Sequence, residues 1–181
     1  MSDLLVNQDG CAITSVEITR SSRRRKSVGA RLKGNVMLVS APCHIPDTSL
    51  ESIIKSLKEK FSKSLLRKKL NQEKCLVDVA EGINRKYFYG KLKDYFIEYV
   101  TGQKSKFGCC NYQSRSIRIS HRIAFMPQWV RDYVIMHELA HLIEPNHSKA
   151  FWDLVANYKL AERARGYLIA KGMEEEDADN E

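Results

Sequence analysis

Three of the five histidines lie in the short segment HELAHLIEPNH, at residues 137–147. His137 and His141 are four residues apart, so on a helix both imidazole rings project from one face, close enough to bind one tetrahedral zinc ion. A catalytic zinc site needs a third protein ligand and an open fourth position. Pro145 breaks the helix, which lets the chain reverse and bring His147 back to the metal. The spacing therefore predicts one Zn²⁺ per chain, bound by three histidines.

Glu138 directly follows the first of these histidines, which on a helix places its carboxylate beside the metal and within reach of a bound water. Zinc lowers the pKa of such a water toward about 7 and polarises a substrate carbonyl. Glu138 is therefore the expected general base, which takes the proton of the water and returns it to the leaving amine. Two alternatives stay open: a structural zinc closed by a fourth ligand such as Cys109 or Cys110, and a helix whose histidines only pack.

Other polar side chains are weaker candidates. His121, at the end of the segment SIRIS, is a candidate for stabilising an oxyanion or binding substrate, although a lone histidine after a strand more often belongs to the core or the surface. Ser120 and Tyr112 are candidates for the same auxiliary role. The five cysteines show no CxxC spacing, so we interpret them as reduced thiols, and the pair Cys109-Cys110 as packing rather than metal or redox chemistry.

Basic residues outnumber acidic residues by 30 to 22, and the surplus is uneven along the chain. The last eight residues, EEEDADNE, hold six acidic residues and no basic one, so residues 1–173 carry a net charge of +14. Such a surplus favours contact with nucleic acid or another polyanion; the alternative is a solvated surface that keeps the protein soluble. The candidate polyanion-binding residues, from the densest basic run, are Arg23, Arg24, Arg25 and Lys26.

The hydrophobic pattern predicts the elements at the start of the chain. The first forty residues alternate apolar and polar positions around Gly34-Asn35, a pair suited to a hairpin turn, so we expect a small antiparallel sheet. From Asp47, a good helix cap, apolar residues recur at helical spacing to about Leu70, which predicts a long amphipathic helix. Residues 75–100 are rich in Tyr, Phe, Val and Ile, which predicts two or three short strands.

The second half of the chain must position the histidines. The segment SIRIS, at 116–120, alternates and predicts a further strand. A helix that opens near Pro127 carries the histidines and must end near Ile143, because Pro145 disfavours helical geometry at the residue before it. Ser148 is a natural cap for the next helix.

Length and composition limit the number of domains. With 181 residues, of which 43% are hydrophobic, the chain is long enough for one compact core. We expect a single α+β domain over residues 1–173 and a disordered acidic tail at 174–181. No apolar run reaches about eighteen residues and the start MSDLLVNQDG has no basic leader, so we expect neither a membrane span nor secretion, but a cytoplasmic protein.

The stretch RDYVIMHELAHLIEPNHSKAFWDLV, at 131–155, resembles the YgjP-like zinc metallopeptidase domains, which are related to the WLM and SprT-like proteases. The stretches TRSSRRRKSVGARLKGNVMLVSAPCHIP and KSKFGCCNYQSRSIRIS are more loosely similar to the same family. The chain differs from the family pattern at Phe107, where Trp is usual, and at Ser120-His121, where Asn is common.

The resemblance implies an α+β zincin-like fold with N-terminal antiparallel strands, a long amphipathic helix, a mixed sheet whose edge strand lies beside the HExxH helix, and C-terminal helices. It also implies that Glu138 is catalytic. The zinc ligands that it implies are His137, His141 and His147.

Three functions compete on these observations. The first is a zinc-dependent peptidase whose extended substrate adds to the edge of the SIRIS strand. The second is the same peptidase recruited to DNA, suggested by the charge of +14 and by the WLM and SprT-like resemblance. The third is a zinc-stabilised module that binds nucleic acid or protein without turnover. A peptide or protein substrate and no membrane partner are therefore expected, and the oligomeric state is left open.

Overall fold

The computed structural model describes residues 13–72, 75–103 and 105–171, and the chain divides into two compact units, Met1–Lys68 and Lys69–Glu181. The single domain expected over residues 1–173 stays a prediction. The tail at 174–181 lies outside the described residues. Among the helices of the described residues, none has the length and apolar character that a membrane span needs.

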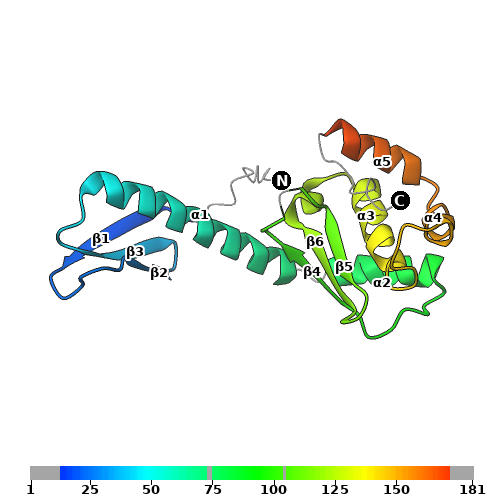
Figure 1. Cartoon of the computed structure of the whole chain (residues 1–181), viewed down its shortest axis with the longest axis horizontal. Coiled ribbons are helices and arrows are strands. Elements are labelled where there is room, and N and C mark those ends of the chain that lie inside the picture. The colour runs from blue at the N-terminus through cyan, green and yellow to red at the C-terminus, as the bar shows by residue number, and fades with distance from the viewer. Residues whose placement is uncertain (1–12, 73–74, 104, 172–181) are drawn as a thin grey trace, which may run out of the picture. The chain divides into compact units, whose positions relative to one another are not determined.

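The N-terminal unit contains a three-stranded sheet (Figure 1). Its strands are β1 (Ser15–Ser21), β2 (Gly29–Lys33) and β3 (Val36–Pro42), in the order β1-β3-β2. The predicted hairpin is confirmed: β2 and β3 are antiparallel and joined by Gly34-Asn35, where Gly34 has a φ of +61°, as the first position of a type II′ turn requires.

The expectation that this sheet is wholly antiparallel is wrong, because β1 pairs with β3 in parallel. The reason lies in the length of the two connections. A two-residue turn forces β2 and β3 to be neighbours, whereas the seven residues between β1 and β2 can span two strand spacings, about 9.6 Å. The third strand therefore inserts between the first two.

The predicted long helix is confirmed as α1 (Asp47–Gln72). Leu50, Ile54 and Phe61 belong to one face of this helix and pack with the sheet residues Met37 and Val39 in one hydrophobic cluster. Asp47 is the first helical residue, because the Leu50 amide donates to the carbonyl of Pro46. The Asp47 carboxylate instead pairs with the guanidinium of Arg20.

The second unit has its own three-stranded sheet, in which β4 (Phe96–Val100) and β5 (Gly108–Asn111) flank β6 (Ser116–Ser120). β6 is parallel to β4 and antiparallel to β5. The SIRIS segment is thus confirmed as a strand but is wrongly placed at the edge. Residues just before it fold back as a hairpin, so that β5 is the edge strand that contacts the histidine helix.

Residues Cys75–Tyr87 form the helix α2, so the expectation of strands there is wrong. Leu76, Ala80 and Ile83 recur at a spacing of four and three, which places them on one helical face, and all three are buried. High β-propensity favoured strands, but packing of this face against the core decided the outcome. Only β4 remains a strand in this stretch.

Side-chain amides satisfy the backbone where a neighbouring strand is missing. The Asn71 Nδ2 group donates to the Tyr99 carbonyl of β4 at 2.9 Å, and the Asn71 Oδ1 accepts from the Tyr99 amide at 2.8 Å. Asn84 makes the same pair of hydrogen bonds with Leu92, at 2.9 and 3.2 Å. Asn71 therefore occupies hydrogen-bonding groups on the outer edge of β4.

The histidine helix is α3 (Gln128–Ala140), which begins directly after Pro127 and follows the short 3₁₀-helix η1 (His121–Phe125). It packs against β5 and β6 on one side and against α4 (Lys149–Val155) and α5 (Ala161–Ala170) on another (Figure 1). Its buried residues lie at the centre of the main hydrophobic cluster of the second unit. The helix is therefore a rigid support for the side chains that it presents.

Candidate active site

The chain reverses direction after α3, as the sequence predicts. Ala140 is the last residue of the helix, and the turn that follows is closed by the Glu144 amide, which donates to the Ala140 carbonyl at 2.9 Å. Ser148 then caps α4, because its Oγ accepts a hydrogen bond from the Phe151 amide at 3.3 Å. His147 lies between these two ends and is carried back toward α3.

The three histidines meet at this reversal. The Nε2 atoms of His137 and His147 are 3.2 Å apart, and one ring nitrogen from each of the three histidines lies within 4.8 Å of the other two. Nitrogens bound at 2.0–2.1 Å to a tetrahedral zinc lie about 3.3 Å from one another. The donor set therefore fits an ion of the size and ligand preference of zinc. The group contains neither Cys109 nor Cys110.

Neighbouring groups fix the orientation of the rings. The Nδ1 atom of His141 lies 3.1 Å from the Glu144 carbonyl oxygen, to which it can donate, and in that tautomer the Nε2 lone pair is the one that can bind a metal. The ring of His141 stacks on that of Phe151, with 4.4 Å between the ring centroids, and the ring of His147 stacks on that of Trp152, with 5.5 Å between the centroids. Burial, and then the neighbouring His141 and His147, hold the pKa of His137 well below its usual value. A neutral imidazole is the form that binds metals.

Glu138 lies beside this group with its side chain turned into the protein. It is 6% exposed, and among the described residues its Oε2 atom has no hydrogen-bond partner. Burial raises the pKa of Glu138 to about 8, an effect that the charge of Lys106 partly opposes. A carboxyl group with a pKa near neutrality can both accept and return a proton, which is what a general base and acid must do.

The backbone of β5 approaches Glu138 at Gly108. A Cβ atom on residue 108 would lie 2.3 Å from Oε1 of Glu138 and 2.6 Å from its Cγ, closer than atoms tolerate. Residue 108 must therefore be glycine for the carboxyl group to occupy this position. Gly108 was not predicted as a functional residue from the sequence; the available signal was a glycine at the start of a strand, which often marks a close approach of another group.

If Glu138 is the general base that the sequence predicts, Gly108→Ala is expected to lower kcat for peptide cleavage by about ten-fold to 100-fold with little change in zinc content, because a catalytic group displaced by about 1 Å loses much of its effect. Steady-state kinetics and elemental analysis on the same samples measure both quantities. Gly102→Ala is the control, since a Cβ there meets nothing within 4 Å. An unchanged kcat in Gly108→Ala would mean that the position of Glu138 is not critical.

Among the auxiliary candidates, His121 is not part of the group that the three histidines form. Ser120 is fully buried at the end of β6, where its hydroxyl accepts from Arg122 at 3.3 Å. His121 is half-buried as the first residue of η1, and Tyr112 is exposed in the turn after β5. Burial, followed by the charge of Glu138, raises the pKa of Cys110 to about 12, so this thiol stays protonated.

The basic candidates lie in the other unit. Their positions are exposed in the connection between β1 and β2, and the residues are Arg23, Arg24, Arg25 and Lys26.

A pocket of about 720 Å³ lies between α2, the start of α3 and the residues after α4. Gln128 and Asp132 line it from α3. His137 follows Asp132 by five residues, which on a helix turns its side chain about 140° away. This pocket is therefore on a different face of α3 from the histidines. Burial raises the pKa of Asp132, and the charge of Arg131 partly opposes the effect.

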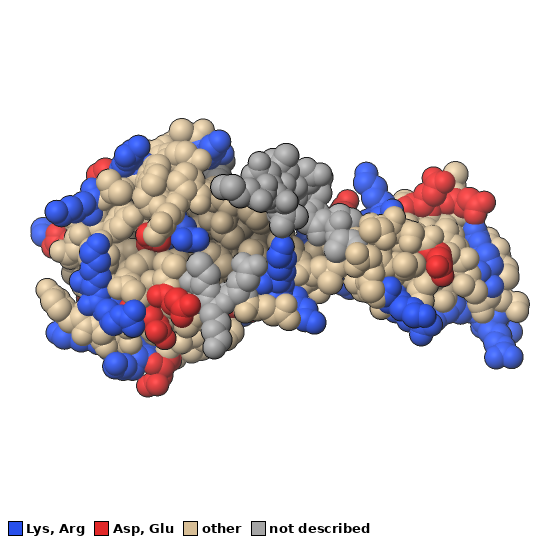
Figure 2. Space-filling view, turned by 180° about the vertical axis from the view of Figure 1, so that it is seen from behind, with Lys and Arg blue, Asp and Glu red and all other residues tan. Residues whose placement is uncertain are grey.

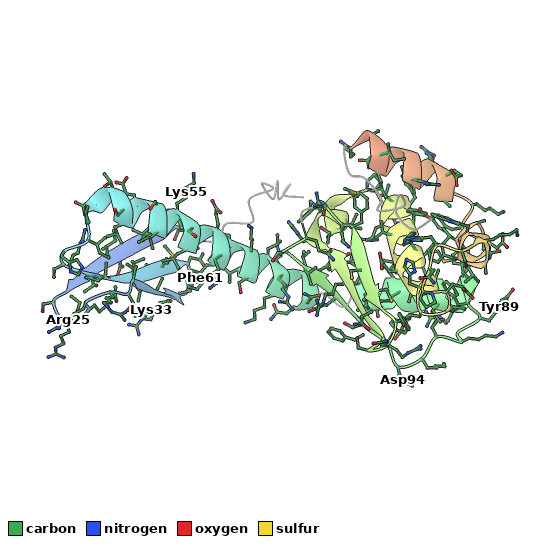
Figure 3. The ribbon with its side chains drawn as sticks, in the orientation of Figure 1. Arg25, Lys33, Lys55, Phe61, Tyr89 and Asp94 are labelled. Carbon is green, nitrogen blue, oxygen red and sulfur yellow. The ribbon has the colours of Figure 1, made fainter. Side chains whose placement is uncertain are left out.

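Asp132→Asn is expected to raise the melting temperature at pH 7 and to have less effect near pH 4. The folded-state pKa of Asp132 is raised above its ordinary value of 3.8, so its contribution to stability is fully present below that value and is lost as the pH rises through the folded pKa. Asparagine carries no charge, so the variant does not lose this stability at pH 7. Thermal unfolding at both pH values measures the effect. The control is Asp94→Asn, because Asp94 is exposed at the surface (Figure 3). Equal gains at both pH values would contradict the electrostatic explanation.

Parts of the chain are similar to known proteins. Residues 97–160 match the family model of the YgjP-like metallopeptidase domain. The crystal structure of the metallopeptidase zymogen of Pyrococcus abyssi abylysin is similar, with a TM-score of 0.48 and 19% identity over 53% of this chain and 93% of that chain. That of the metallopeptidase zymogen of Methanocaldococcus jannaschii jannalysin has a TM-score of 0.46 and 20% identity, over 53% and 95% of the two chains. No curated protein matches the sequence.

The matched segment contains β4, β5, β6, α3 and α4, and with them all three histidines and Glu138. The resemblance seen in the sequence is thereby confirmed. Residues 97–160 are therefore similar to the YgjP-like metallopeptidase domain.

Proposed function

We propose that the chain is a zinc-dependent peptidase that hydrolyses peptide bonds in extended segments of protein. The observation that carries this proposal is the convergence of three histidine nitrogens within 4.8 Å of one another, next to the buried carboxyl group of Glu138. The residues that would hold the ion are His137, His141 and His147. Zinc bound there supplies a Lewis acid that acidifies a water ligand and polarises the carbonyl group of the substrate.

The chain's own residues account for the proton transfers. Glu138 is positioned to take the proton of the attacking water and to hold it on its carboxyl group, where burial favours the neutral form. It then returns the proton to the leaving amine. The Nδ1 contact of His141 with the Glu144 carbonyl fixes its tautomer, so that Nε2 is the nitrogen that can bind the metal.

An extended substrate is supported by the position of β5. In the described part of the chain this strand pairs only with β6, so its other side offers free backbone groups. An added peptide strand gains main-chain hydrogen bonds there, whatever its sequence. At Gly108 the same strand touches Glu138, so a peptide paired with β5 runs close to the general base. The edge of β5 replaces the edge of β6 that the sequence had suggested.

The test is to measure zinc content by elemental analysis and cleavage of an unfolded protein such as casein. About one zinc per chain, cleavage that a chelator abolishes, and recovery on adding back zinc are the expected results. Bound zinc without cleavage of casein or of a mixed peptide library would contradict the peptidase and favour a zinc-stabilised binding module. A preparation that binds no zinc would contradict both.

A further inference from the structure

The N-terminal unit carries a surplus of charge that the peptidase site does not use. Its residues 13–68 contain thirteen Lys and Arg but only four Asp and Glu, a net charge of +9. Figure 2 shows basic side chains at the far end of this unit and along its lower side in that view. The positions of these side chains on the sheet determine which of them form an ordered surface.

The sheet of this unit has one packed face and one open face. Ala30 and Leu32 of β2 pack into the hydrophobic cluster with α1. Because side chains alternate along a strand, Gly29, Arg31 and Lys33 point to the opposite face. Within the described part of this unit, α1 covers only the first face (Figure 1).

Arg24 adds a third charge to this open face. A Cβ atom on Gly29 would lie 3.2 Å from Nη1 and 3.3 Å from Nη2 of Arg24, so the guanidinium group lies directly over the glycine. The Nη1 group also lies 3.5 Å from the Ser27 carbonyl oxygen. The groups at positions 29, 31 and 33 of β2 are therefore all cationic, at intervals of about 7 Å along the strand. We name Arg24, Arg31 and Lys33 the basic row.

The surroundings leave the basic row without a nearby acidic group on its own sheet. The open face has one acidic residue, Glu17, which lies on β1, and β3 separates β1 from β2. Arg20 does not belong to the row, because it bonds the carbonyl groups of Pro42 and Ile45 and pairs with a carboxylate. Arg25 and Lys33 project on the sheet side of the unit, whereas Lys55 projects from the other side of α1 (Figure 3).

We propose that the basic row binds the phosphate backbone of a nucleic acid. Three cations at regular spacing on an open strand match a linear series of phosphates, and the planar fork of arginine suits phosphate oxygens. A membrane surface fits less well, since among the described residues of this unit the only exposed large hydrophobic side chain is Ile18, and bilayer binding needs apolar anchors. The proposal does not depend on the peptidase activity.

Fluorescence anisotropy with the full chain tests the proposal, using a labelled DNA duplex, a single-stranded DNA and a single-stranded RNA. Affinity is measured between about 50 and 300 mM salt, where each phosphate contact contributes about 0.9 to the slope of log K against log salt on duplex DNA. The row variant is Arg24→Gln with Arg31→Gln and Lys33→Gln. The control variant also removes three exposed charges, from α1: Lys55→Gln with Lys58→Gln and Lys63→Gln.

The row variant is expected to lose about 2.7 from the slope on duplex DNA and at least about ten-fold in affinity, while the control keeps most of both. The probe that binds most tightly identifies the nucleic acid. Equal losses in the two variants would overturn the proposal, because binding would then be diffuse. No binding to any probe at about 50 mM salt would also overturn it.

A further binding experiment, with phospholipid vesicles, distinguishes binding to the phosphates of nucleic acid from binding to those of lipid. Vesicles of phosphatidylcholine with phosphatidylserine are expected to bind more weakly than the best nucleic acid, and equal or tighter binding that depends on the row would overturn the proposal. Circular dichroism and thermal unfolding confirm that both variants are folded. If the triple variant unfolds, Lys33→Gln against Lys55→Gln is the second pair, with an expected slope change of about 0.9.

Discussion

Glu138→Gln is expected to leave zinc bound while kcat for peptide cleavage falls by about 10²-fold to 10⁴-fold. Glutamine has nearly the same shape as glutamate, so it can fill the space against Gly108 without moving the backbone of β5. It cannot accept a proton at neutral pH. The loss should therefore appear in kcat, with zinc content by elemental analysis equal to that of the unmodified chain.

Glu144→Gln is the matched control for this experiment. Glu144 is a second glutamate near the histidines, but its contact with His141 uses the backbone carbonyl, which the substitution keeps. Normal cleavage is expected. If Glu138→Gln cleaved at the normal rate with zinc bound, another group would have to be the base; if it lost zinc as well, the change would report on the metal site instead.

His141→Ala is expected to weaken zinc binding by more than about 100-fold, since loss of a residue that only orients a ligand already costs 10-fold to 100-fold. Cleavage should fall to background. Zinc at about 100 times its dissociation constant stabilises the intact chain by about 2.7 kcal/mol, and the variant should lose this gain at the same zinc concentration. Thermal unfolding with and without zinc measures the difference.

His121→Ala is the control for the metal site, because His121 is also half-buried and belongs to η1. It should keep the zinc-dependent rise in melting temperature. A fall in kcat with zinc retained would assign His121 an auxiliary role in catalysis. A normal zinc response in His141→Ala would show that this histidine is not a ligand, and the proposed centre would have to be abandoned.

Features that depend on neighbours along the chain could be predicted from the sequence. The spacing of His137 and His141 fixes their common face on any helix, and Pro145 and Ser148 mark the reversal that returns His147. The hairpin at Gly34 and the length of α1 follow in the same way from local turn chemistry and from the period of the apolar residues.

Features that depend on contacts between distant residues could not be predicted. The close approach of Gly108 to Glu138 joins residues thirty positions apart, and no local rule relates them. The order of strands in both sheets is a choice among pairings that the alternating pattern allows equally. At α2 the helical spacing was readable, but propensity pointed to strands, and burial of one face prevailed.

The Asn71 amide bonded to Tyr99 has a consequence for association between molecules. An open sheet edge is a template on which another chain can extend the sheet, and repeated extension leads to aggregates. Here β4 is occupied at Tyr99, so extension of this second sheet is favoured at β5. If two molecules paired through β5, the joined sheet would end in a β4 strand on each side. Growth of this sheet therefore stops at two chains, without giving rise to fibres.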